Sequence, residues 1–234
     1  MKTWFRIGLG MAVLMLASVV EIYAQNIFFP TKEGTVLVYQ FKKKGRDKVT
    51  HYSRLTIKNV KGTETGKSIS YVTEILNINR NPLSETPVTG EVTVKNDVIT
   101  MDMSHLLLNM PLAKATKVEI TGIRMELPAN LQPGQSIKDS NMTIIVDMGI
   151  STMKTSCVST GGKCEAIEDV TVSAGTFKCY KITQTVATTI YAILNSTTSS
   201  RSAIWYAPGI GTVKNEQYDD KGKVERSMEL AEVN

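Results

Sequence analysis

Apolar and polar residues alternate along most of the chain after its first 25 positions. Leu37, Tyr39 and Phe41 share one parity, and the same period of two returns in segments 68–76 and 140–149. Successive side chains of a β-strand point to opposite faces, so this period is typical of strands with one buried face. Threonine, valine and isoleucine, which suit a pleated and half-buried surface, are frequent throughout. The pattern predicts a β-rich protein.

Clusters of turn-forming residues separate the alternating segments. Lys44–Asp47, Thr160–Lys163 and Asp219–Gly222 each combine glycine with polar neighbours, which is typical of tight reversals between antiparallel strands. Strands are expected near 35–43, 48–60, 68–78, 87–95, 97–102, 115–127, 140–149, 151–160, 163–173, 176–190, 200–207, 211–218 and 223–231. This number of short-linked strands predicts a mainly β fold, with a single curved antiparallel sheet and an open, barrel-like architecture.

Helical patterning is confined to one short segment. Asp102–Leu112 offers Ser104 as an N-cap before an apolar run, and Pro111 limits the helix to about two turns. No linker-like stretch divides the chain. We therefore expect one β-rich domain, from 26 to 234, with one short helix.

The first 24 residues have the features of a secretory signal peptide. Lys2 and Arg6 precede an uncharged apolar run over 7–20, and Ala24 provides a small residue before the expected cut. An uncleaved membrane anchor is the alternative, but the run is shorter than the ~20 residues that span a bilayer. The protein is thus expected to be exported to the periplasm, the cell envelope or the medium, with no transmembrane segment in the mature chain.

Charge argues against nucleic acid as a partner. The formal net charge is +5, from 27 basic and 22 acidic side chains that are interspersed along the chain. The longest basic cluster, Lys42–Arg46, falls in an expected turn. Nucleic-acid binding favours a broad basic surface with aromatic residues for stacking, which this pattern lacks.

Three cysteines, Cys157, Cys164 and Cys179, would meet an oxidising compartment after export. An expected turn at Gly161–Gly162 would place Cys157 opposite Cys164, close enough to form a disulfide. Cys179 would then be a buried free thiol. The alternative is that all three thiols are core residues.

Motifs of catalysis are missing from the sequence. It contains neither a Gly-x-Ser-x-Gly elbow, nor a Cys-x-x-Cys pair, nor a phosphate-binding loop. The only histidines are His51 and His105, so a hydrolase would have to assemble a scattered site around one of them. We expect a protein that is not an enzyme and that holds no cofactor and no metal.

Four short motifs resemble a family of exported proteins of Bacteroides-type bacteria known as TapB-like and otherwise uncharacterised. They are Phe28–Thr35, Leu131–Gln135, Val170–Ile182 and Ile204–Lys214, and Ser173 stands where that family often has proline. The resemblance implies a curved antiparallel sheet, similar to the half-barrels of periplasmic lipoprotein carriers. Some relatives are described as lipid-binding. The resemblance transfers no catalytic residue.

The concave face of such a sheet is the candidate binding site. The residues expected to line it are Leu37, Tyr39, Phe41, Tyr71, Met142, Ile144, Met148 and Tyr206. They would shelter a lipid or another apolar ligand by burying its surface. The alternative function is a structural or assembly protein of the envelope, which would bind a protein partner at a sheet edge by strand addition.

Overall fold

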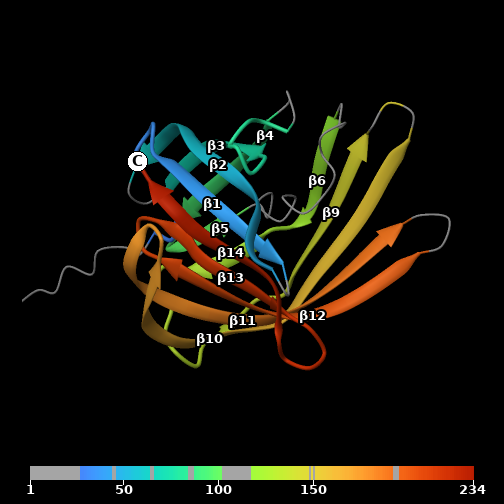
Figure 1. Ribbon diagram of the computed structural model, residues 1–234. Helices are drawn as coiled ribbons and strands as arrows, with labels where there is room; N and C mark the ends of the chain where they lie inside the picture. The colour runs from blue at the N-terminus through green and yellow to red at the C-terminus, as the bar shows by residue number, and fades with distance from the viewer. Residues whose placement is uncertain are drawn as a thin grey trace, which may run out of the picture.

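The computed structural model describes residues 27–43, 46–63, 66–83, 87–101, 117–147, 149, 151–191 and 195–234, without the side chains of 46, 47 and 118 (Figure 1). The described residues form β-strands and no helix. The strands are β1 (Val36–Lys43), β2 (Arg46–Thr63), β3 (Gly66–Leu76), β4 (Val88–Lys95), β5 (Val98–Met101), β6 (Lys117–Ile123), β7 (Met125–Pro128), β8 (Ser136–Ile137), β9 (Ser140–Asp147), β10 (Thr152–Val172), β11 (Gly175–Tyr191), β12 (Ser196–Ala207), β13 (Gly211–Tyr218) and β14 (Val224–Val233).

All the strands belong to one antiparallel sheet. Its order is β6-β9-β10-β11-β12-β13-β14-β1-β2-β3-β4-β5-β7, and β8 pairs with β10 beside this path. The sheet curls until it is nearly closed, with a seam between the two end strands, β6 and β7. This confirms the mainly β, single curved antiparallel architecture.

Two sequence expectations fall outside the described residues. These are the signal peptide at 1–24 and the short helix at 102–112. Within the described part, no helix has the length and apolar character needed to cross a bilayer.

Alternation along the strands separates an inner face from an outer face. In β9 every second residue, from Ser140 to Val146, is buried, while the residues between them are half-buried or exposed. The inner faces of the strands meet in one large apolar cluster. A smaller cluster, centred on Trp205, lies on the other face of β12. The large cluster is the core of the fold.

The first and the last strand of the described chain lie side by side. Strand β1 pairs with β14, from Leu37 opposite Val233 to Lys43 opposite Arg226. Val36 and Asn234 exchange two backbone hydrogen bonds of 2.9 Å. The middle of the sheet therefore joins the first and the last strand of the sequence.

The expected turn at Gly161–Gly162 is wrong, because one strand, β10, runs through it. The register against β11 shifts between Thr160 and Lys163, which marks a bulge. A Cβ on Gly162 would lie 2.9 Å from Cβ of Ile137, so the missing side chain lets β8 pack closely there. The chain reverses at Gly175, between the strands expected at 163–173 and 176–190, where φ is +133° and β10 leads into β11.

The expected strand at 115–127 is two strands. Gly122 has φ of +119°, and β6 ends one residue later at Ile123. Strand β7 then pairs with β5, while β6 pairs with β9. The break therefore places two neighbouring segments at opposite ends of the sheet.

Candidate functional site

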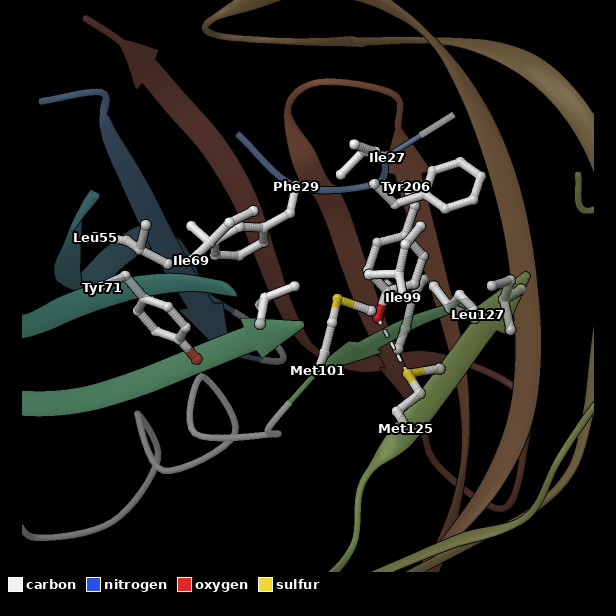
Figure 2. Packing of buried hydrophobic residues seen from close by; sticks show 14 of the residues in the cluster. Ile27, Phe29, Leu55, Ile69, Tyr71, Ile99, Met101, Met125, Leu127 and Tyr206 are labelled. Carbon is white, nitrogen blue, oxygen red and sulfur yellow. Dashed lines mark hydrogen bonds between the residues drawn. The ribbon is translucent and has the colours of Figure 1, made fainter. Parts of the chain in front are cut away.

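The residues expected to line the concave face come together in the core cluster. Leu37, Tyr39, Phe41, Tyr71, Met142, Ile144 and Tyr206 all belong to it, and their exposed fractions lie between 0% and 6%. Met148 lies outside the described residues. Figure 2 shows Tyr71 and Tyr206 among other core side chains, including Met101 and Met125. Among the described residues, this face is packed against the protein's own side chains.

A short segment before β1 helps to fill the interior. The Phe28 ring packs edge-on against Tyr180, with 5.0 Å between ring centroids, and the Phe29 ring lies 5.3 Å from that of Tyr71. Gly209 N–H donates a 2.7 Å hydrogen bond to the carbonyl of Ile27 and anchors the segment. Sequence reasoning used Phe28 and Phe29 only as part of a family motif. Two adjacent aromatic residues before Pro30 were the available signal for this packing.

Polar groups are also enclosed in the core. The Tyr206 hydroxyl donates a 3.5 Å hydrogen bond to Sδ of Met125 (Figure 2). Burial raises the pKa of both Tyr39 and Tyr206 above the ordinary value, so both stay protonated. The hydroxyls of Ser53 and Thr73 are buried without a hydrogen-bond partner in the described structure. Such a group loses about 1–3 kcal/mol of hydration without compensation.

His51, one of the two histidines around which a hydrolase site would have to form, packs against an aromatic ring. His51 stacks on Phe41 with 4.3 Å between centroids and 10° between ring planes. Its Nδ1 lies 2.9 Å from Oγ1 of the neighbouring Thr50. His105 lies outside the described residues. No group of three or more metal-ligating side chains occurs within the described ranges.

The expected Cys157–Cys164 disulfide is absent, and all three thiols are free. Both residues lie on β10, where seven residues of extended chain separate their Cα atoms by roughly 20 Å. A disulfide needs Cα atoms about 5.5–6 Å apart. Cys157 lies opposite Met142 and Thr188, and Cys164 lies opposite Ile182. The disulfide prediction failed because it depended on the turn at Gly161–Gly162.

The three thiols are expected to react slowly in the folded protein. Burial raises the pKa of Cys157 and Cys164, and it raises the pKa of Cys179 to about 12, with help from Asp169 and Glu168. A raised pKa lowers the fraction of reactive thiolate at neutral pH. Titration with Ellman's reagent, on protein purified without reductant, should therefore detect three thiols promptly only after unfolding in guanidinium. A single thiol after unfolding would show that a disulfide forms.

A second feature, the β11–β12 arm, lies beyond the closed core. We define the arm as Val186–Ile190 of β11 and Ser196–Ser200 of β12, which pair with each other. In Figure 1 its two orange strands run to the right, past the ends of β13 and β14. The arm's β12 residues are exposed from Ser196 to Ser199 and half-buried at Ser200. The Ile190 side chain is 44% exposed.

One edge of the arm is open. Strand β13 pairs with β12 only from Arg201 to Ala207, opposite Tyr218 to Gly211. Within the described structure, no strand pairs with Ser196–Ser200 on the side away from β11. Alternate residues of an antiparallel strand direct their N–H and C=O groups to the same side. The edge therefore presents a row of backbone donors and acceptors to solvent.

The two edge strands at the seam, β6 and β7, have features that prevent pairing with another strand, whereas the open edge of the arm lacks most of them. Strand β6 contains Lys117 and Glu119, which form a 2.8 Å ion pair. Its backbone is also irregular at Gly122, where φ is positive. Strand β7 has only four residues and ends at Pro128. Charges, short length and proline are the usual means of keeping strand edges from pairing. Ser196–Ser200 contains neither a charged residue nor a proline.

Sequence reasoning placed the start of this strand at residue 200 and so missed the open edge. The available signal was the pair Thr197 and Thr198, because threonine is enriched in strands. The edge at 196–200 is open because β13 pairs only with the later residues of β12. The local sequence of 196–200 does not reveal where that pairing stops.

Comparisons with known proteins agree with this fold. The model of a family described as DUF3108-like matches residues 32–230. A Parabacteroides distasonis protein described as a lipoprotein superposes with a TM-score of 0.78 at 20% identity, covering 90% of this chain and 100% of that one. A Bacteroides fragilis protein described as exported, with a YmcC-like fold, gives 0.73 at 18% identity, covering 88% and 98%. A search of curated proteins gives no match.

At these identities the likeness establishes the fold. The two solved structures come from Bacteroides-type bacteria, as the sequence motifs led us to expect. The TapB-like name and the lipid-binding function stay predictions.

Proposed function

This chain belongs to the DUF3108-like family, and it shares its fold with proteins described as exported or as lipoproteins. We propose that it is an exported binding protein of the cell envelope that performs no catalysis. Its partner is a polypeptide, which it binds by strand addition at the open edge of the β11–β12 arm. The observation that carries this proposal is that β12 extends five residues, Ser196–Ser200, beyond its pairing with β13.

Strand addition suits the arm because the backbone supplies the binding groups. An extended partner segment would form hydrogen bonds with the free N–H and C=O groups of Ser196–Ser200 and continue the sheet. The arm is already held in a strand conformation, since Val186–Ile190 pair with β10 on one side and with β12 on the other. Little conformational entropy would therefore be lost by the arm on binding.

An apolar ligand inside the curved sheet is the second candidate. The observation that favours it is the pair of buried hydroxyls, Ser53 and Thr73, which lack partners in the described structure and would suit a ligand's polar end. Against it stands the packing of the expected lining residues, which an apolar ligand would have to displace.

Site-specific crosslinking in cells tests the proposal. A photoreactive amino acid at Thr198 should give a defined crosslinked protein in higher yield than the same probe at Thr188, because Thr198 lies on the edge strand that the partner would contact. Thr188 is the matched control because it lies directly opposite Thr198 but inside the sheet, between β10 and β12.

Mass spectrometry of organic extracts from the native protein separates the two candidates. Strand addition predicts no stoichiometric small molecule in the extract. Equal crosslinking at both positions, together with one apolar molecule per chain in the extract, would replace the proposed function by the carrier function.

A further inference from the structure

We propose that the occupant of the open edge is a second copy of this chain, so that two arms pair through β12 in an antiparallel, two-fold symmetric contact. This inference rests on the proposed function and names its partner. The geometry is that of a four-stranded ribbon, in which β11 and β12 of one molecule are followed by β12 and β11 of the other.

The edge is self-complementary in length and register. Only five residues, Ser196–Ser200, are free on this side, because Tyr218 of β13 occupies the edge at Arg201. An antiparallel pairing centred on Thr198 uses all five, with Thr198 opposite its own counterpart and Ser196 opposite Ser200. A two-fold contact requires that the same patch serve both partners, and this register meets that condition.

The side chains of the edge suit a second copy. All five carry a hydroxyl and none carries a charge, so the paired register brings serine and threonine opposite each other without repulsion. Cross-strand hydroxyl pairs stabilise antiparallel sheets. The arm already uses this contact, since Oγ1 of Thr189 and Oγ1 of Thr197 lie 2.9 Å apart.

The lack of charge also argues for this occupant over a basic or acidic peptide. A segment selected to bind charged polypeptides would place opposite charges along the edge. The first charged side chain after the edge is Arg201, which lies beside Tyr218 and not in the free region. A contact of five residue pairs is small compared with stable interfaces of about 1,200–2,000 Å², so the dimer is expected to be weak and concentration-dependent.

Charge reversal at the two-fold axis tests the inference. Sedimentation equilibrium of the mature protein should show dimers that form as the concentration rises. Thr198→Lys and Thr198→Glu should each weaken dimerisation by roughly tenfold or more, because like charges would face each other directly across the axis. An equimolar mixture of the two variants should dimerise again.

The control variant is Thr188→Lys. It adds the same charge on β11, directly opposite Thr198 but one strand away from the edge, and it should dimerise like the wild type. Thr198 is exposed, so circular dichroism and the melting temperature should be unchanged in its variants. A wild type that stays monomeric, a Thr198→Lys variant that still dimerises, or a mixture that fails to reassociate would each overturn the inference.

The crosslinking experiment separates this inference from the proposed function. A product at Thr198 with twice the mass of the chain supports both. A product that contains a different protein overturns the second copy but keeps strand addition. The absence of any protein product at Thr198 overturns both.

Discussion

Replacing Phe28 by alanine is expected to lower the free energy of unfolding by about 3–5 kcal/mol, the range found when a buried aromatic ring is removed from a core. Phe28 has no exposed surface, packs edge-on against Tyr180 and lies 6.3 Å from the Tyr206 ring. Phe28 shares its segment with Phe29, which packs on Tyr71, and with Ile27, whose carbonyl accepts a hydrogen bond from Gly209 N–H. The Phe28 ring therefore helps to fix the segment on the inner face and also fills the interior.

Urea denaturation measures the effect of Phe28→Ala. With a slope of about 2–3 kcal/mol per molar urea for a domain of this size, the midpoint should fall by about 1–2.5 M. Ile78→Ala is the control, because this side chain is 63% exposed and its removal should change stability by less than about 0.5 kcal/mol. A Phe28→Ala loss below about 1 kcal/mol would contradict the packing of the segment against the sheet.

Gly90→Val is expected to destabilise the protein by about 3 kcal/mol or more through overpacking. Gly90 lies opposite Tyr71 in the β3–β4 pair, and a Cβ there would lie 2.3 Å from Cζ of the Tyr71 ring. The ring has little room to move, since Tyr71 is 2% exposed and packs against Phe29. The glycine is required for space and not for its backbone angles, because its φ is not positive.

A double-mutant cycle isolates this contact. Gly90→Ala should be less harmful when Tyr71 is shortened to leucine, with a coupling free energy of about 1–2 kcal/mol. Gly66→Ala, in the same pair of strands, has no atom within 4 Å of its added Cβ and should be nearly neutral. Additive effects of the Gly90 and Tyr71 changes would mean that the ring does not occupy the space above Gly90.

The fold class was predictable because alternation is a local property of the sequence. The parity of Leu37, Tyr39 and Phe41 follows from the two-residue period, and their partners Leu55, Ser53 and His51 extend the inner face across β2. Any register that buries this parity brings the same apolar residues together. The shared core cluster of the expected lining residues is therefore a direct result of the alternation.

The bulge at Gly161–Gly162 was not predictable, because glycine serves both turns and strand irregularities. The choice between them depends on Ile137, a residue from distant β8 that packs where the Gly162 side chain would be. The disulfide prediction inherited this error. The inward packing of Phe28 and Phe29 does not follow from the two-residue period either, because both residues lie outside the alternating segments.

The pairing of β1 with β14 affects the order in which the molecule can fold. These two strands are nearly 200 residues apart in the chain, and their contact joins the two halves of the sheet. Pairings between such distant segments form late, because the intervening chain must first be brought together. A chain that crosses a membrane with its N-terminal end leading would hold β1 without one of its neighbours until β14 arrives. During that interval the unpaired side of β1 is open to aggregation.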